Sequence, residues 1–123
     1  MTVWLSASAL AATPAKAYPA ELAGTWMIQS DTQEGALPCK ASDPLVQESE
    51  ATMSISGSDL RQYESSSTPR SIRRIAKRPA VWEIQETEEE ADNLRRPTRV
   101  YVLQSDRLTV FEDDFTLVYK RCL

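Results

Sequence analysis

The last third of the chain, TRVYVLQSDRLTVFEDDFTLVYKR over residues 98–121, reads as three short strands joined by two turns. Apolar and polar residues alternate along each of the three segments, as in half-buried β-strands. The expected strands are residues 98–104, 108–111 and 116–121. Ser105-Asp106 and Asp113-Asp114 supply the residue types that favour tight turns between them. We therefore expect an antiparallel three-strand meander in this region.

Segments upstream show the same alternation. Residues 25–30 and 80–87 each place two large apolar side chains on one face, and a hairpin over residues 52–65 turns at Gly57-Ser58-Asp59. Short, hairpin-connected strands at this spacing are typical of a β-sandwich or a closed antiparallel barrel. Because a closed barrel leaves no open edge, we expect an all-β fold: a small antiparallel closed barrel of seven to eight strands over residues 18–123.

The inward-facing positions define an expected core that would about fill an eight-strand interior and leave little space for a large ligand. Its members are Trp26, Ile28, Met53, Ile55, Leu60, Trp82, Ile84, Val102, Leu108, Val110, Leu117 and Tyr119.

Four segments depart from this pattern. Residues 31–51 are polar and contain glycine and proline, so they are expected to be a long connection. Residues 65–69 read as a loop, and residues 88–92 as a solvated acidic turn. Residues 71–78 suit either a helical turn or a bulged strand.

Charge is distributed in blocks along a chain whose formal net charge is −4. A basic block over residues 70–78 is followed by an acidic block over 83–92 and a second basic block over 95–99. Antiparallel pairing would bring opposite charges side by side on a solvated face. A basic patch for an anionic partner is the alternative. The net negative charge argues mildly against nucleic acid and anionic membranes as partners.

The first residues resemble an export signal. Residues 3–12 are mostly apolar, and Pro14 and Ala15-Lys16-Ala17 follow, which is the pattern of a signal peptide with its cleavage site. We expect residues 1–17 to be a signal peptide, cleavage to leave Tyr18 first, and the protein to be periplasmic or secreted. Met1-Thr2 supplies no positive charge before the apolar run, so an ordinary N-terminal helix or arm is the alternative. The run is too short to span a bilayer.

The chain has two cysteines, Cys39 and Cys122. In an exported protein they form the obvious disulfide pair, which would close a loop of about 80 residues. Two unrelated buried thiols are the alternative. A zinc site is not expected, because the chain contains no His and only two Cys.

The first and last expected strands carry a family resemblance. Gly24-Thr25-Trp26 on the first strand, with Arg121 on the last, resembles the calycin group: lipocalins, fatty-acid-binding proteins, avidins and bacterial metalloproteinase-inhibitor barrels. In that group the tryptophan packs at the barrel base beneath the basic side chain. The resemblance therefore implies a barrel-base cation–π pair between Trp26 and Arg121.

Among these families, the start at residues 21–26 and the single disulfide are most similar to the metalloproteinase inhibitors. In that family the N-terminal tail enters the protease cleft, which implies Tyr18, Pro19 and Ala20 as partner-binding residues. The family's disulfide closes a local loop, whereas Cys39 and Cys122 here lie far apart in the sequence.

No catalytic pattern stands out. The chain has no His to act as a general base, and its serines have no visible activating partner. We therefore expect no enzyme activity, no cofactor and no metal, and a monomer that acts by binding. The first hypothesis is a protease-inhibitor-like, protein-binding module whose partner is an exported protease or another envelope protein. A structural envelope protein is a second.

The third hypothesis is a small barrel that binds an apolar ligand. Aromatic side chains at an open barrel mouth would suit such a guest. Tyr63, Trp82 and Tyr101 are the candidate lining residues.

Overall fold

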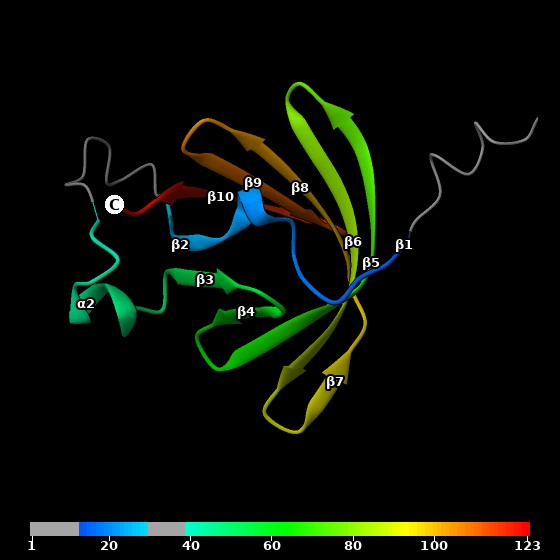
Figure 1. The fold of residues 1–123 in the computed structure, drawn as a ribbon. Coiled ribbons are helices and arrows are strands. Elements are labelled where there is room, and N and C mark those ends of the chain that lie inside the picture. Colours follow the sequence, from blue (N-terminus) through cyan, green and yellow to red (C-terminus); the bar gives the residue numbers. More distant parts are fainter. Residues whose placement is uncertain (1–12, 30–38) are drawn as a thin grey trace, which may run out of the picture.

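The computed structural model describes residues 13–29 and 39–123, and within them the chain is almost entirely β-structure (Figure 1). The expected signal peptide lies largely outside these residues. The elements are β1 (Thr13–Pro14), η1 (Ala20–Leu22), β2 (Gly24–Ile28), α2 (Pro44–Gln47), β3 (Thr52–Ser56), β4 (Asp59–Gln62), β5 (Ser65–Lys77), β6 (Ala80–Glu90), β7 (Asn93–Arg95), β8 (Thr98–Gln104), β9 (Arg107–Glu112) and β10 (Phe115–Arg121).

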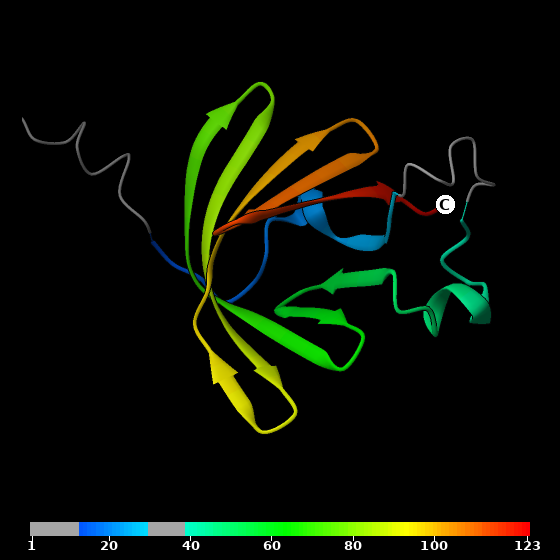
Figure 2. The same ribbon diagram turned by 180° about the vertical axis from the view of Figure 1, so that it is seen from behind.

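Eight antiparallel strands close into a barrel in the order β5-β4-β3-β2-β10-β9-β8-β6, and pairing of β5 with β6 completes the ring. Figures 1 and 2 show the strands curving around a common interior, with the long β5–β6 hairpin projecting from one side. Of the two remaining strands, β1 pairs with β5 and β7 pairs with β6. The prediction of a small closed all-β barrel is confirmed.

The C-terminal meander is confirmed as well, since β8 pairs with β9 and β9 with β10. The hairpin of β3 and β4 turns at Gly57, whose φ of 58° lies in the left-handed region that glycine adopts without strain. Eleven of the twelve expected core positions lie in the core or pack against it. Val102 does not: it is only half-buried, and its neighbour Tyr101 is the fully buried hydrophobic residue of β8.

The expectations about the irregular segments were partly wrong. Residues 65–69 are not a loop but the start of β5. The same strand includes residues 71–77, with register shifts between Pro69 and Ser71 and between Arg74 and Ala76, so the bulged-strand alternative is the right one there. Strand β6 runs on to Glu90, so most of the expected acidic turn is strand. The long connection contains α2, which Asp43 caps by accepting a hydrogen bond from the Leu45 amide at 2.9 Å.

The charged blocks meet across β5 and β6, as expected from antiparallel pairing. Arg73 lies opposite Glu83, and their side chains form an ion pair at 3.0 Å on the barrel surface. Glu86 and Glu88 belong to the same acidic block but face the interior instead. The solvated-face interpretation therefore holds for only part of the block.

One end of the barrel is closed by η1 and by Arg121. The Arg121 guanidinium lies 4.3 Å from the centroid of the Trp26 ring and donates to the carbonyl oxygens of Ala23 and Glu21. The Trp26 indole N–H donates to the Leu22 carbonyl at 3.0 Å. Gly24 has a φ of 140°, a backbone conformation that other residues rarely adopt, so this position favours glycine. The Arg121 Nη1 atom lies within 2.9 Å of where a Cβ would be.

The disulfide links Cys39 to Cys122, as predicted. Backbone hydrogen bonds reinforce it: the Leu123 amide donates to the Cys39 carbonyl and the Ala41 amide to the Leu123 carbonyl. In Figure 1 the segment that leads into α2 accordingly lies beside the C-terminus, on the side away from the β5–β6 hairpin. The bridge fastens this segment to the end of β10.

Replacing both bridge residues, Cys39→Ala with Cys122→Ala, should lower the free energy of unfolding by roughly 4 kcal/mol. The reason is that the two cysteines are separated by 83 positions, so the bridge removes much conformational freedom from the unfolded chain. Urea titration followed by tryptophan fluorescence measures the change. An unfolding free energy within 1 kcal/mol of the parent (about a fivefold change in the folding equilibrium) would contradict it.

Candidate functional site

The barrel interior contains a buried arginine bound to three glutamates. Arg99 donates from Nη1 to Glu86 at 2.6 Å, from Nη2 to Glu88 at 2.8 Å and from Nε to Glu112 at 2.6 Å. All four side chains are at least 90% buried. Burial of a charge is costly unless it is paired and hydrogen-bonded, and here every charge is.

Strand alternation places these side chains inside. Glu86 and Glu88 continue the inward-facing series that begins with Trp82 and Ile84 on β6. Glu112 follows Leu108 and Val110 at the same spacing on β9. Arg99 and Tyr101 face inward on β8, which lies between those two strands. The arginine can therefore reach carboxylates on both of its neighbours.

Glu86 is the most deeply buried of the carboxylates. Besides Arg99, it accepts hydrogen bonds from the Tyr18 hydroxyl at 2.9 Å and from the Tyr101 hydroxyl. Burial raises the pKa of Glu86, and the opposing effects of Arg99 and the two hydroxyls only partly offset it. Burial and the nearby Glu86 carboxylate raise the pKa values of Tyr18 and Tyr101. Both hydroxyls therefore stay protonated and act as donors.

Arg95 connects the buried cluster to solvent. It lies on β7 with its side chain half-exposed, donating to Glu88 from Nε at 2.9 Å and to Glu112 from Nη1 at 3.2 Å. Burial alone would raise the pKa of Glu88, but the hydrogen bonds and charges of Arg99 and Arg95 outweigh burial and hold the pKa below 4.5. Glu86 and Glu88, two positions apart, thus have pKa values shifted in opposite directions.

A cavity of about 340 Å³ opens beside this cluster, at the barrel end opposite Trp26. Its apolar wall comes from β3, β4, β9 and β10 and includes Met53, Leu60, Val110 and Leu117. Its charged wall includes Arg95, Arg99, Glu88 and Glu112, and Glu50 and Glu90 complete the charged lining. The cavity therefore offers apolar contact on one side and polar contact on the other.

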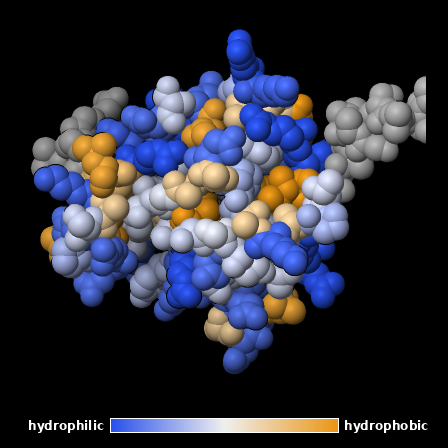
Figure 3. Space-filling view, viewed as in Figure 1, coloured by the Kyte–Doolittle hydropathy of each residue, from blue (hydrophilic) through white to orange (hydrophobic). Residues whose placement is uncertain are grey.

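Two aromatic side chains flank the entrance. Tyr63 is 51% exposed and Phe115 is 50% exposed, and both line the cavity. Elsewhere, on the face shown in Figure 3, hydrophobic residues form separate spots within a mostly hydrophilic surface. Exposed aromatic residues beside a cavity are a feature of ligand entrances.

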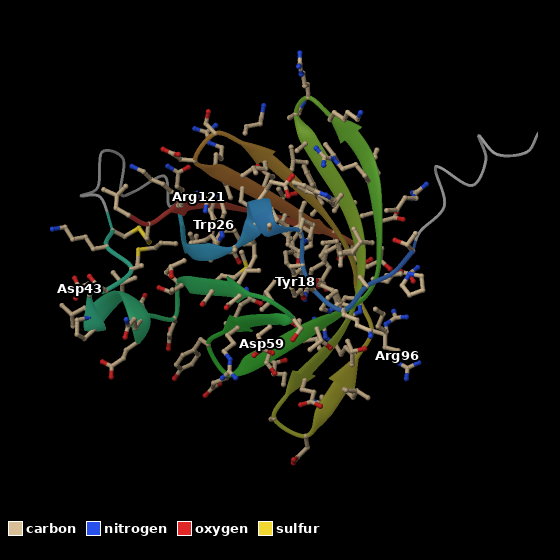
Figure 4. All side chains as sticks on the ribbon, viewed as in Figure 1. Tyr18, Trp26, Asp43, Asp59, Arg96 and Arg121 are labelled. Atoms are coloured by element: carbon tan, nitrogen blue, oxygen red, sulfur yellow. A yellow bond between two sulfur atoms is a disulfide. The ribbon has the colours of Figure 1, made fainter. Side chains whose placement is uncertain are left out.

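The residues predicted to contact a protein partner, Tyr18, Pro19 and Ala20, lie just before η1 and at its first position. Tyr18 is buried, with 6% of its surface exposed, and Figure 4 shows it near the middle of the molecule. Its amide also donates to the Gly57 carbonyl at 2.9 Å. Tyr18 thus acts as an internal anchor, because its only polar side-chain atom is taken up by Glu86. Pro19 is half-buried and Ala20 is exposed.

The predicted ligand-lining residues separate into two places. Tyr63 and Tyr101 line the cavity at the open end. Trp82 does not line it. Its side chain is buried in the core, and the Arg74 guanidinium lies 4.8 Å from its ring centroid. Arg74 also lies 3.6 Å from Glu21 of η1, so Trp82 belongs to the closed end.

Sequence reasoning missed the central residues of the site: Glu86, Glu88, Arg99 and Glu112. A signal for them was present, because all four are in step with buried apolar residues on their own strands. The charged blocks predicted a solvated face for Glu86, Glu88 and Arg99, and Glu112 lay just beyond the expected strand over residues 108–111. Strand alternation would have placed them inside.

In residues 13–29 and 39–123, no group of three or more potential metal-ligating side chains has the geometry to hold a metal ion. A helix long and apolar enough to cross a membrane does not occur in that part of the chain either. Comparison with family models, curated protein sequences and solved structures finds no match to this chain.

Replacing the buried arginine, Arg99→Met, should lower the free energy of unfolding by about 3–5 kcal/mol, because it leaves three buried carboxylates without their shared partner. Arg73→Met is the matched control: it removes an arginine from a half-exposed pair with Glu83 and should cost about 0–1 kcal/mol. Chemical denaturation of both variants measures the difference. Equal losses would contradict the structural role of Arg99.

The pH dependence of stability should separate Glu86 from Glu88. The folded-state pKa of Glu88 is lowered, so its contribution to stability is present above pH 4.5 and is lost as the pH falls through its folded pKa. The folded-state pKa of Glu86 is raised, so its ionisation lowers stability as the pH rises above 4.5. Relative to the parent, Glu88→Gln should become less stable as the pH rises, and Glu86→Gln more stable.

Denaturation midpoints of the three proteins across the acid range measure these slopes. If the stability difference from the parent changes with pH in the same direction for both variants, the two pKa shifts do not have opposite directions and the prediction is wrong.

Proposed function

We propose that this chain is an exported, non-catalytic binding protein that holds a small ligand in the open end of a calycin-like barrel. The observation that carries the proposal is the cavity of about 340 Å³ next to the Arg99 cluster. Its volume falls at the lower end of the ~300–1,000 Å³ range of small-molecule sites. Its lining combines an apolar wall with a few fixed polar groups, as such sites do.

The disulfide supports the export part of the proposal, because such bonds persist mainly in oxidising compartments. The contact between Arg121 and Trp26 supports the calycin-like part. The non-catalytic part rests on the state of the buried carboxylates. Glu88 and Glu112 accept hydrogen bonds from arginines at both oxygens, so neither is available as a base.

The protease-inhibitor alternative receives less support from the structure. It needs Tyr18, Pro19 and Ala20 to enter a partner's cleft, whereas the Tyr18 ring is buried and bonded to Glu86. Releasing Tyr18 would leave that buried carboxylate without one of its donors, at an unfavourable cost. We therefore favour the cavity over the tail as the binding site.

Methionine methyl NMR offers a direct test with octan-1-ol as the probe. Met53 lines the cavity, whereas Met27 lies on β2 and faces the other side of the sheet. Octanol should shift the Met53 methyl signal in a saturable way and leave that of Met27 unchanged. Leu117→Trp, which fills the cavity, should abolish the shift, and Thr116→Trp on the exposed face of the same strand should keep it.

The proposal fails if octanol leaves Met53 unshifted up to its solubility limit. It also fails if the response survives in a folded Leu117→Trp protein, because the probe would then be binding elsewhere.

A further inference from the structure

The ligand's charge can be inferred from how the cavity's own charges are paired, given the proposed function. Arg95 and Arg99 are the two basic residues of the lining. Together they give six hydrogen-bonded contacts to glutamates inside the barrel. A carboxylate or phosphate ligand would compete with these glutamates for guanidinium groups whose positive charge is already neutralised. The cavity is therefore badly suited to an anion.

Two further charged residues of the lining are acidic and unpaired. Glu50 and Glu90 are exposed, and neither takes part in an ion pair with any residue in the described ranges. Counting Glu88 and Glu112 against the two arginines, the lining carries a net charge of −2. The potential at the entrance thus favours a cation, and low-dielectric walls strengthen that preference.

The apolar wall of the cavity determines which uncharged part of a ligand can bind there. Met53, Leu60, Val110 and Leu117 give it an apolar surface, and Phe115 extends that surface to the entrance. Three neutral polar side chains of the lining already have partners: the Gln62 side-chain amide donates to the Tyr119 hydroxyl at 3.0 Å, and the Tyr101 hydroxyl donates to Glu86. A ligand body here makes apolar contacts and needs few hydrogen bonds.

We infer that the cavity selects an amphipathic amine, whose apolar body lies against the wall formed by Met53, Leu60, Val110 and Leu117 and whose ammonium group lies at the entrance, in the negative potential to which Glu50 and Glu90 contribute. The cavity supplies the affinity for the body. The unpaired carboxylates at the entrance supply the preference for positive charge.

A matched series of probes tests this inference: octylammonium, octan-1-ol and octanoate, titrated at pH 7 and low ionic strength with the Met53 methyl signal as readout. Octylammonium should bind at least about tenfold more tightly than octanol, the factor expected for one or two partly screened charge contacts. Octanoate should bind more weakly than octanol. Added salt should reduce the advantage of the amine.

Two double variants locate the charge preference. Glu50→Gln with Glu90→Gln should bring octylammonium affinity close to that of octanol and leave octanol binding unchanged. Glu48→Gln with Glu89→Gln removes the same charge from exposed neighbours that do not line the cavity, and should retain most of the preference.

The outcomes separate this inference from the function on which it rests. If octanoate binds as tightly as octylammonium, the inferred amine selectivity is wrong and the binding cavity stands. If the preference survives in Glu50→Gln with Glu90→Gln, the assigned position of the ammonium group is wrong. If none of the three probes shifts Met53, the binding function itself is overturned.

Discussion

The pairing of one buried guanidinium with three buried carboxylates constrains much of this structure. Arg99 lies on β8 and its partners lie on the two strands beside it, so the ion pairs connect β6, β8 and β9 at one level of the barrel. Each partner would be costly to bury alone. A shift of β8 by a single residue would move Arg99 outside and leave the three glutamates without it, and the same shift of β6 or β9 would remove that strand's glutamates from the cluster. The cluster thus adds a strict register condition to the apolar packing.

The cluster also divides the interior into two unlike halves. Toward η1 the core is apolar and closed, with Trp26 covered by Arg121 and Trp82 by Arg74. Toward the turns that precede β5, β7 and β10, the interior becomes polar and opens into the cavity. Tyr18 links the halves, because its amide is fixed at the Gly57 turn while its hydroxyl reaches Glu86. A packed closed end with an open cavity at the other end suits the proposed binding without large movement.

Much of the fold followed from short-range patterns, and the site did not. Alternation and turn residues predicted the meander, the β3–β4 hairpin and the core around Trp26 and Ile84, because each depends on neighbours within one strand or hairpin. The charged interior depends on which strands meet across the barrel, and a single sequence does not state that. Glu86 and Arg99 were therefore assigned to the surface by residue type. The expected core contained Val102 and not Tyr101. A tyrosine is buried readily when its hydroxyl has an acceptor, and the acceptor for Tyr101 is Glu86, which lies on another strand.

The polar interior depends on the Arg99 guanidinium being buried and held by three carboxylates. Arginine Nε–H NMR tests it most directly, with the signal assigned by its absence from Arg99→Lys. A buried and hydrogen-bonded Arg99 Nε–H should exchange with solvent far more slowly than those of exposed arginines such as Arg61 and Arg96. An Arg99 signal that exchanges as fast as theirs would show that the side chain is solvated. That result would contradict the polar interior and the cavity chemistry derived from it.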